Sequence, residues 1–455
     1  MDKNRYDTDD IIFALATPWG SSALAVLRVS GKGSVNLVSK AFSRGQALLE
    51  GASHTLVHGY LIDKIRGRDL DEVVVALFKD GRGYTGEESL EISCHGSMAA
   101  IQEIFRLFED LGMRPASPGE FTFRAFMHGK MDLTQAEAVM EVVSAQSQKG
   151  HAMALKRLEG DLFSLIEGFK QELLNLMSIL EVQLDYGEDE VEEEEPFPIE
   201  RLEGVQQAIE QLLATYAIGK LYSEGAKIVL AGATNVGKST LFNLFLKEER
   251  AIVSPIHGTT RDFIESQVNL EGIPIRLYDT AGLRATGDLI EEEGIKRTHR
   301  LLEEADLILL MFDGSEHDEQ SLLFYENIVD DPRCIVVWNK SDLALSKKFS
   351  NGYALSAKRG EGFKELSKEM LKRLKRNYFS LDEQHLVIES ARQYEELARA
   401  KESLGRVAQL VSASVPLDII AGELSEALNA LGSLTGEVTS SDILKRIFSN
   451  FCVGK

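Results

Sequence analysis

Hydrophobic positions in the first part of the chain recur with two different periods. Short runs rich in Val, Leu and Ala at 23–30 and 72–78 are typical of β-strands. Over 99–109 the apolar residues instead recur every three or four positions, which predicts an amphipathic helix. This mixture of strands, turns and a helix predicts an α+β domain over 1–120.

Beyond this region the helical period dominates. Asp132, followed three positions later by Gln135, forms a pattern that marks the start of a helix. Apolar residues then recur at spacings of three and four, which predicts one face of a long helix in a bundle. They are Leu155, Leu158, Leu162, Ile166, Phe169, Leu173, Leu176 and Leu180. We assign 121–221 to the first half of a helical domain.

The middle of the chain alternates strand-like and helix-like segments, at 227–233, 240–247, 273–279, 290–303, 305–313, 318–328, 333–338, 353–356 and 361–376. That alternation predicts a mostly parallel sheet with helices on both faces. The helical pattern returns afterwards, first over 387–400. The expected fold class is therefore multidomain α+β and α/β. An N-terminal α+β domain is followed by a discontinuous helical domain (121–221 and 378–455), with an α/β domain inserted at 222–377.

Charge and cysteine content narrow the class of protein. The 455 residues include 50 Lys and Arg against 72 Asp and Glu, a net charge of −22. A chain this acidic does not coat polyanions nonspecifically, so any contact with nucleic acid must be local or shared with a partner. Three widely spaced cysteines disfavour a disulfide framework and a CxxC zinc site. Because a secretion signal and long apolar runs are both missing from the sequence, we expect a cytoplasmic protein that does not bind membranes.

Two clusters of like charge need an interpretation. Eight of the eleven residues in 185–195 are acidic, which is typical of a solvated loop, and nothing orders these carboxylates for a metal. A basic cluster lies in the last turns of a predicted helix, where the helix dipole favours cations; its members are Lys372, Arg373, Lys375 and Arg376. A patch that binds RNA is the alternative for this second cluster.

The strongest motif is Gly232-Ala-Thr-Asn-Val-Gly-Lys-Ser239, which fits G-x-x-x-x-G-K-[ST] between a predicted strand and a predicted helix. Its glycines let the backbone wrap a phosphate, and the N–H groups at the helix start bind the negative charge. Lys238 is expected to reach the β- and γ-phosphates, and Ser239 to bind Mg²⁺. An isolated match could be a glycine-rich turn, but further motifs follow it.

Three more motifs occur in order. Asp279-Thr-Ala-Gly282 ends a strand, where the Asp would position Mg²⁺ through water and the glycine N–H would sense the γ-phosphate. Asn339-Lys-Ser-Asp342 follows the strand 334–338, and its last carboxylate can accept two hydrogen bonds from guanine that adenine does not offer. Ser356-Ala-Lys358 is expected to contact guanine O6 through its backbone. Together they resemble the translation-factor-like GTPases, so the inserted domain is expected to be a Ras-like P-loop GTPase domain.

The hydrolytic groups must differ from those of Ras-type enzymes, which place a glutamine after Asp-Thr-Ala-Gly. Here that position is Leu283. Gly258-Thr-Thr-Arg-Asp262 is the expected switch loop, with Thr260 as a ligand of Mg²⁺ and of the γ-phosphate. Asn235 and the loop 254–259 offer oxygens for a K⁺ ion at the position of an arginine finger. Glu291 is a candidate to orient water, and a carboxylate favoured at a helix N-terminus is its alternative role.

The complete set of residues expected to contact GTP comprises Asn235, Val236, Gly237, Lys238, Ser239, Thr240, Ser254, Pro255, Ile256, His257, Gly258, Thr259, Thr260, Asp279, Thr280, Ala281, Gly282, Asn339, Lys340, Ser341, Asp342, Ser356, Ala357 and Lys358.

The two ends of the chain carry a resemblance to a known family. The C-terminal segment 447–455 is similar to the terminal Cys-x-Gly-Lys signature of the MnmE (also TrmE) family of tRNA-modification GTPases, and 439–444 also fits. The stretches 27–30, 84–96 and 118–126 resemble the first domain of that family. The nucleotide motifs alone would not separate this family from Era-like ribosome-assembly GTPases, whereas the two ends do.

The resemblance implies an N-terminal domain that binds a tetrahydrofolate derivative and forms a homodimer. It also implies K⁺-dependent GTP hydrolysis with Mg²⁺, and a partner, the FAD-binding MnmG, in a heterotetramer. The implied reaction adds a carboxymethylaminomethyl or aminomethyl group to C5 of the wobble uridine (U34) of tRNA.

The roles that the resemblance implies fall on a few residues. The folate contacts are Arg28, Glu91, Lys130 and Lys455, and the K⁺ ligands are Asn235, Ser254, the Ile256 backbone oxygen and Thr259. Glu291 orients water, and the catalytic set is Glu291, Lys238 and Cys452. Ser254 stands where a Thr is frequent in the family, and the acidic run is longer than the family pattern. The remaining alternative, a GTP-dependent ribosome-assembly factor, is disfavoured because no basic RNA-binding domain is evident.

Overall fold

The computed structural model describes residues 9–185, 197–248, 265–279, 300–315, 325–343, 352–376, 386–413 and 415–455. Contacts divide the chain into two compact units, each built from separate segments. The first unit combines Met1–Met140, Arg157–Leu202 and Glu402–Lys455, and the second combines Glu141–Lys156 and Glu203–Lys401. Among the described helices, none is both long and apolar enough to cross a membrane.

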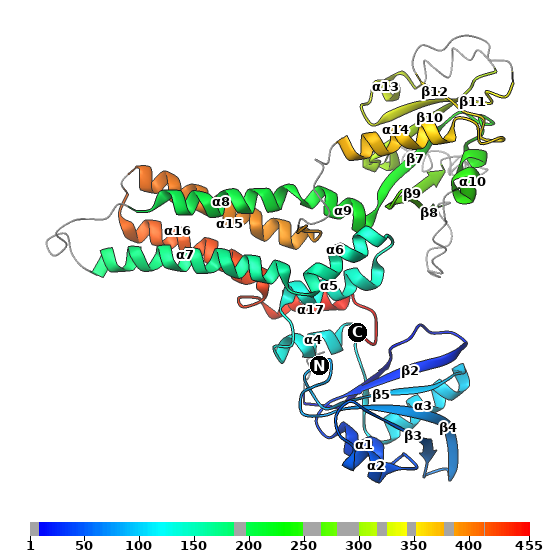
Figure 1. Ribbon diagram of the computed structural model, residues 1–455, viewed down its shortest axis with the longest axis vertical. Helices are drawn as coiled ribbons and strands as arrows, with labels where there is room; N and C mark the ends of the chain where they lie inside the picture. The colour runs from blue at the N-terminus through cyan, green and yellow to red at the C-terminus, as the bar shows by residue number, and fades with distance from the viewer. Residues whose placement is uncertain are drawn as a thin grey trace, which may run out of the picture. The chain divides into compact units, whose positions relative to one another are not determined.

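A six-stranded sheet forms the N-terminal part of the first unit, in the order β3-β4-β5-β2-β1-β6 (Figure 1). Its strands are β1 (Ile12–Leu15), β2 (Ser22–Ser30), β3 (Thr55–Asp63), β4 (Arg68–Phe78), β5 (Ser89–Gly96) and β6 (Arg114–Pro115). All neighbours are antiparallel except β1 and β6. The inward side chains of β2, such as Leu27, pack with those of α1 (Ser34–Ser39), α2 (Gly45–Glu50) and α3 (Met98–Asp110) in one core. The strands expected at 23–30 and 72–78 and the helix expected at 99–109 are confirmed.

The other face of this sheet is covered only in part. Ile12 and Ala14 of β1 pack there with Ala116 and Phe121, whereas β2, β3 and β4 expose large side chains. Side chains that alternate with the core point outward, and Leu24, Leu56, Tyr60 and Val74 are all exposed. Arg28 and Glu91 are cross-strand neighbours with the same outward alternation. An antiparallel sheet can leave one face in water, but this one displays large apolar side chains there.

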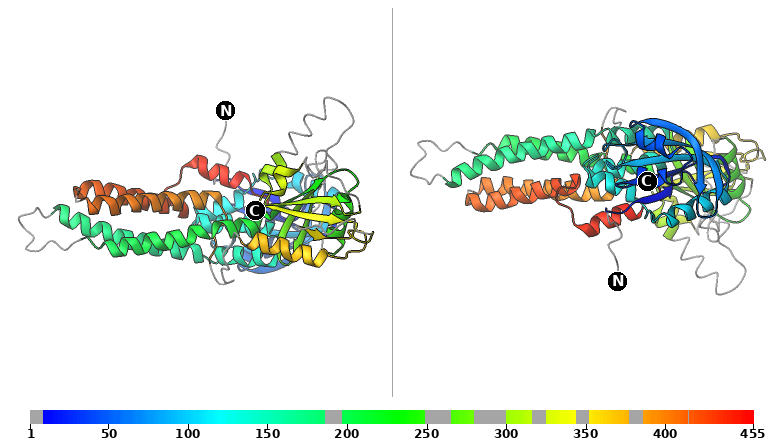
Figure 2. Two further views of the ribbon diagram at one scale, coloured as in Figure 1. Left: turned by 90° about the horizontal axis from the view of Figure 1, so that it is seen from above. Right: turned by 90° about the horizontal axis from the view of Figure 1, so that it is seen from below.

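Helices complete the first unit. They include α4 (Glu120–Met127), the start of α5 (Leu133–Ser144), α7 (Asp161–Asp185), α16 (Leu417–Thr435) and α17 (Ser441–Ser449). Helix α7 packs along α16, so segments far apart in sequence form one bundle (Figures 1 and 2). Phe448 of α17 packs edge-on against Phe123 of α4 at a ring distance of 5.4 Å. The C-terminal helix is thereby fixed to the segment that follows the N-terminal sheet.

The long helix expected across 155–180 is wrong, because it is broken in two. Helix α6 (Gln148–Leu158) ends two residues before α7 begins. Gly160 has a φ of +96°, a backbone conformation that ends a helix. The Gln135 side chain donates to the Leu158 carbonyl at 2.9 Å, which satisfies one of the last carbonyls of α6. In α7 the stripe from Leu162 to Leu180 is buried, whereas in α6 Leu155 and Leu158 are only half-buried.

The expected cap at Asp132 is confirmed. Its Oδ1 accepts from the Thr134 and Gln135 backbone N–H groups at 2.7 and 3.2 Å. The Gln135 side chain accepts from the Asp132 N–H at 3.1 Å, which completes a reciprocal capping box.

A second six-stranded sheet lies in the second unit, in the order β12-β11-β10-β7-β9-β8. Its strands are β7 (Ala226–Gly232), β8 (Glu265–Leu270), β9 (Ile273–Asp279), β10 (Leu307–Asp313), β11 (Cys334–Asn339) and β12 (Tyr353–Ala354). All described pairs are parallel except β8 and β9. Helices α10 (Lys238–Glu248) and α14 (Phe363–Arg376) pack on one face, and α13 (Glu326–Val329) packs on the other. The mostly parallel sheet with helices on both faces is as expected.

Three details of the second unit differ from or lie beyond the sequence expectations. The antiparallel edge strand β8 was missed. The helix expected over 387–400 begins only at Ala391, as α15 (Ala391–Ser412), and residues 386–390 before it form no helix. The expected helices 290–303 and 318–328 lie largely outside the described residues, and so does the acidic run 185–195 of the first unit. The remaining helices are α8 (Ile199–Ala214) and α9 (Tyr216–Glu224).

Candidate functional site

The first predicted motif forms a tight loop between β7 and α10. Gly232 and Gly237 have φ values of +138° and +97°, which L side chains rarely adopt. A Cβ atom on Gly237 would lie 2.2 Å from the Asn339 Nδ2 atom, so this glycine lets a second loop approach. The Lys238 ammonium donates to the carbonyls of Gly232 and Ala233 at 2.9 and 2.6 Å. This lysine therefore lies over the loop, where a bound phosphate would meet it.

The second motif meets the first at the ends of β7 and β9. Ser239 Oγ donates to Asp279 Oδ2 at 2.8 Å, and the aspartate is only 4% exposed. These are the hydroxyl and the carboxylate that the sequence places at a Mg²⁺ site. Because Mg²⁺ prefers hard oxygen ligands, the pair suits that ion in its chemistry.

The third motif joins the phosphate loop to the fourth motif. Asn339 is 3% exposed, its Nδ2 donates to the Val236 carbonyl at 2.7 Å, and its Oδ1 accepts from the Ala357 N–H at 2.9 Å. One side chain thereby fixes two loops that are far apart in sequence. Lys340, with a φ of +63°, pairs with Asp313 at the end of β10.

Asp342 lies where the sequence predicts the guanine-reading carboxylate. The Ser356 hydroxyl donates to its Oδ1 at 2.7 Å, and this bond lowers the pKa of Asp342. The guanidinium of Arg359 lies 3.8 Å from the other oxygen. The carboxylate is therefore held ionised and able to accept hydrogen bonds from a base.

Several predicted site residues lie outside the described residues and receive no structural account. They are Ser254, Pro255, Ile256, His257, Gly258, Thr259, Thr260, Thr280, Ala281, Gly282, Leu283 and Glu291. Of the four expected K⁺ ligands, only Asn235 is described, with a φ of +62° in the phosphate loop.

A second set of predicted residues meets on the partly covered face of the N-terminal sheet. Arg28 donates to Glu91 Oε1 from Nε at 3.1 Å and from Nη2 at 2.8 Å. Glu91 Oε2 has no partner among the described residues. The guanidinium lies 4.9 Å from the ring centre of Tyr84 and 5.6 Å from that of Phe121. Two aromatic faces thus hold a cation that is itself paired.

The C-terminal tail reaches the same place. Arg28 Nη1 donates to the Gly454 carbonyl at 3.3 Å, and the Gly119 N–H donates to the Cys452 carbonyl at 3.4 Å. Gly454 has a φ of +97°, and a Cβ there would lie 2.5 Å from the Leu15 carbonyl oxygen. Burial, together with the nearby Arg28 charge, lowers the pKa of Lys455. Cys452 itself is exposed.

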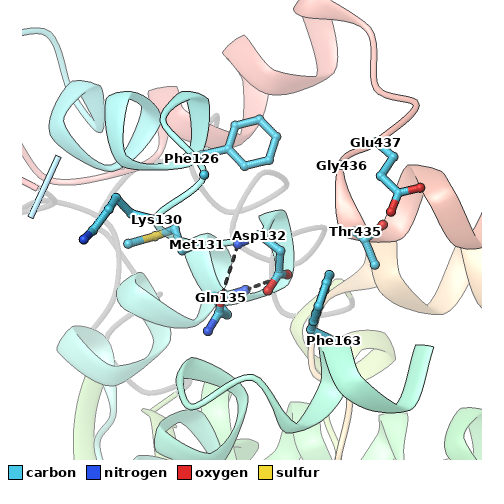
Figure 3. A pocket seen from close by; sticks show the side chains of 10 residues that line it. Phe126, Lys130, Met131, Asp132, Gln135, Phe163, Thr435, Gly436 and Glu437 are labelled. Atoms are coloured by element: carbon cyan, nitrogen blue, oxygen red, sulfur yellow. Dashed lines mark hydrogen bonds between the residues drawn. The ribbon is translucent and has the colours of Figure 1, made fainter. Parts of the chain in front are cut away.

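Lys130 belongs to this region through a different contact. Its ammonium donates to the Gly81 carbonyl at 3.4 Å, and its methylene groups lie beside Gly86. The loop between these glycines also carries Tyr84 to Arg28. Lys130 further lines a pocket of about 360 Å³ with Phe126, Met131, Asp132, Gln135, Phe163 and Glu437, among others. Figure 3 shows its side chain pointing away from Asp132 and Glu437.

Sequence reasoning missed the residues that hold Arg28. Tyr84 and Phe121 are members of the stretches that resemble the family's first domain, but no role followed from them. The Tyr84 hydroxyl shares a 2.8 Å hydrogen bond with Thr122, and burial raises its pKa. Arg124, which is fully buried, pairs with Asp10 and Glu120 and fixes α4 against the sheet. Aromatic residues inside those stretches were the available signal.

A mostly parallel sheet whose strand ends carry a phosphate loop, a serine bonded to a buried aspartate and an Asn-Lys-Ser-Asp loop defines a P-loop GTPase domain. Residues 11–130 match the family model described as the GTP-binding protein TrmE N-terminus, and 133–452 match that of the MnmE helical domain.

Three similar proteins carry the description tRNA modification GTPase MnmE. The protein of Borrelia turicatae is 40% identical over 464 residues, covering 99% of this chain and all of the relative. The protein of Aquifex aeolicus is 41% identical and covers 98% of this chain and 99% of the relative. The protein of Treponema denticola is 39% identical and covers all of both chains. The chain belongs to the MnmE family of tRNA modification GTPases.

Proposed function

We propose that this protein is a K⁺-dependent GTPase that acts with an FAD-binding, MnmG-like partner on the wobble uridine of tRNA in the cytoplasm. The product would carry a carboxymethylaminomethyl or aminomethyl group at C5 of U34. The observation that carries the nucleotide part is the bridge from Asn339 to both the phosphate loop and the guanine loop. Membership of the MnmE family supports the tRNA part.

Each step of GTP hydrolysis is assigned to particular residues of the chain. Lys238 would bind the β- and γ-phosphates, and Ser239 with Thr260 would hold Mg²⁺. Asn235, Ser254, Ile256 and Thr259 would hold K⁺, which supplies the positive charge that an arginine finger supplies elsewhere. Glu291 would orient the attacking water. We expect GTP hydrolysis to be much faster in K⁺ than in Na⁺. Equal rates in the two salts would reject the role assigned to K⁺.

Guanine selection would depend on Asp342. Its ionised carboxylate can accept hydrogen bonds from the N1–H and the 2-amino group of guanine, at the cost of its bond to Ser356. Asp342→Asn replaces one acceptor oxygen by a donor. We expect the variant to prefer xanthosine triphosphate over GTP in a competition assay, whereas unchanged GTP preference would remove Asp342 from this role.

The one-carbon donor would bind where the two ends of the chain meet. Arg28, Lys130 and Lys455 supply positive charge for the carboxylates of a tetrahydrofolate derivative, and Glu91 Oε2 can accept from a pterin-like ring. Cys452 is exposed beside these groups, and we propose it as a catalytic residue. Titration of 5-formyltetrahydrofolate into the full chain tests the site. Glu91→Gln should weaken binding at least tenfold, and unchanged affinity would count against the assignment.

A homodimer through the N-terminal sheet would cover the exposed part of its partly covered face. Leu24, Leu56, Tyr60 and Val74 are exposed there, on the same face as Arg28 and Glu91. Burial of this face against a second copy would remove apolar surface from water and enclose the folate site. Sedimentation of a Leu56→Glu variant should show monomers. One such homodimer together with two copies of the FAD-binding partner would form the proposed heterotetramer.

A further inference from the structure

Helix α14 presents a row of four lysines to solvent. Lys364, Lys368, Lys372 and Lys375 are all exposed and are spaced by four, four and three residues. At about 100° per residue these positions lie within an arc of about 80°. The opposite side of the helix packs in the core of the second unit, through residues such as Leu366, Met370 and Leu374. We call the four lysines the lysine row.

The structure changes the composition of the basic cluster that the sequence suggested. Arg373 is only partly exposed, because it donates to the carbonyls of Pro332 and Cys334 and pairs with Glu369 at 2.9 Å. Arg373 therefore serves packing, while two lysines from earlier turns of the helix join the exposed row. A cap for the helix end explains cations in the last turn but not Lys364 and Lys368, which lie in the first half of the helix.

Local acidic groups neutralise little of this charge. Lys372 is 76% exposed and lies 3.8 Å from Glu369, which already pairs with Arg373. The other three lysines have no acidic partner among the described residues. The helix exposes one carboxylate, that of Glu365, against the four lysines of the row. Its solvent side therefore retains a positive excess. In a chain of net charge −22, this row is a local positive field of the kind that an acidic protein needs to approach a polyanion.

We propose that the lysine row binds the phosphate backbone of tRNA, an inference that rests on the proposed role in tRNA modification. At about 1.5 Å per residue the row spans about 17 Å, enough to follow several successive phosphates. Lysines bind phosphates as point charges and carry no fork for reading bases, so the contact would position the RNA without selecting its sequence. Helix α14 begins five residues after the guanine-loop residue Lys358, so the RNA contact and nucleotide recognition share one continuous segment.

The test is the salt dependence of tRNA binding by the full chain. A variant with all four lysines of the row changed to Gln is compared with wild type by fluorescence anisotropy of labelled tRNA. A control variant carries four other exposed lysines changed to Gln, at Lys40, Lys64, Lys220 and Lys247, and has the same net charge. Hydrolysis of GTP without tRNA is measured in parallel to establish that each variant is folded.

Each phosphate contact contributes about 0.7 to 0.9 to the slope of log affinity against log salt, so four contacts contribute about 3. Between 50 and 200 mM salt the wild type should therefore lose about 60-fold more affinity than the row variant. The control should keep the wild-type slope. The proposal fails if both variants keep that slope, if both lose it equally, or if the wild type does not bind tRNA at the lowest salt.

Poly-L-glutamate as a competing probe separates RNA from an acidic protein partner. If the row variant loses binding to poly-L-glutamate but keeps the full tRNA slope, the row is a protein-docking surface and the proposal is wrong. Normal GTP hydrolysis in K⁺ together with an unchanged tRNA slope would overturn this inference while leaving the proposed GTPase mechanism intact.

Discussion

The bridge made by Asn339 gives the sharpest quantitative prediction. Asn339→Ala removes the donor to the Val236 carbonyl and the acceptor for the Ala357 N–H, which lie at 2.7 and 2.9 Å. The side chain is 3% exposed, so water does not readily replace either bond. A buried polar group left without a partner costs about 1 to 3 kcal/mol, and two such groups cost about 2 to 6 kcal/mol. We expect a loss of that size in the free energy of unfolding of the second unit.

Trp338 is a suitable reporter, because it is 8% exposed and lies one residue before the bridge in β11. The chain's other tryptophan, Trp19, is 57% exposed in the first unit and is replaced by Phe in every variant. Urea unfolding is followed by Trp338 fluorescence without nucleotide, so that the binding of GTP does not add to the measured stability. GTP affinity, measured separately, should also fall, because both loops lose their common support.

Asn269→Ala is the matched control in the same unit. The Asn269 side chain accepts from the Gly272 N–H at 2.7 Å in the turn between β8 and β9, next to solvent. Water can take over that bond, so the expected loss is about 1 kcal/mol or less. If Asn339→Ala destabilises the second unit no more than Asn269→Ala does, the bridge is not what holds the two loops together.

Three further predictions concern the two sites. Gly237→Ala should abolish binding of a fluorescent GTP analogue, because the backbone has a φ of +97° and the new methyl group would lie 2.2 Å from the Asn339 amide; affinity within twofold of wild type would contradict this. Tyr84→Leu should speed release of Lys455 by carboxypeptidase B about two- to fivefold, because a cation–π contact of about 0.5 to 1 kcal/mol with Arg28 is lost, while Tyr84→Phe should match wild type. Affinity for 5-formyltetrahydrofolate should fall as pH rises through the lowered pKa of Lys455, below the ordinary 10.5, because only the ammonium attracts carboxylates. Without ligand, docking of the C-terminal tail should strengthen over the same pH range, since the docked lysine releases its proton more readily than the free one. If the affinity for 5-formyltetrahydrofolate stays flat up to pH 10.5, Lys455 is not a ligand.

Local signals made most elements of both sheets predictable. The strand runs around β2, β4, β9 and β11 combine apolar alternation or continuity with β-branched residues, and the structure has strands there. The capping pair Asp132 and Gln135 was also readable, because its hydrogen bonds join residues three positions apart. The break at Gly160 was not readable from the apolar stripe, since the period continues through it and the bond that caps α6 comes from Gln135, more than twenty residues earlier.

The same division applies to the sites. The phosphate-loop motif specifies its own fold through glycine positions, so Lys238 and Ser239 could be assigned from spacing alone. The platform of Tyr84 and Phe121 under Arg28 could not, because the cation and its two rings come from three separate segments. The membership of the lysine row was hidden for a similar reason: only the folded structure shows that Arg373 binds the Pro332 and Cys334 carbonyls and that Lys364 and Lys368 face water.

By itself, the sequence determined which short segments become strands, helices and phosphate-binding loops, because those choices depend on period, capping and glycine positions within a few residues. It also determined which functional groups stand at the motif positions, namely lysines, carboxylates and hydroxyls. Only the tertiary structure decided which of those groups meet: Asn339 with two distant loops, and Arg28 with Glu91, Tyr84 and the Gly454 carbonyl. The physical reason is that hydrogen bonds and ring contacts act over a few ångströms, so their partners are set by packing between segments and not by distance along the chain.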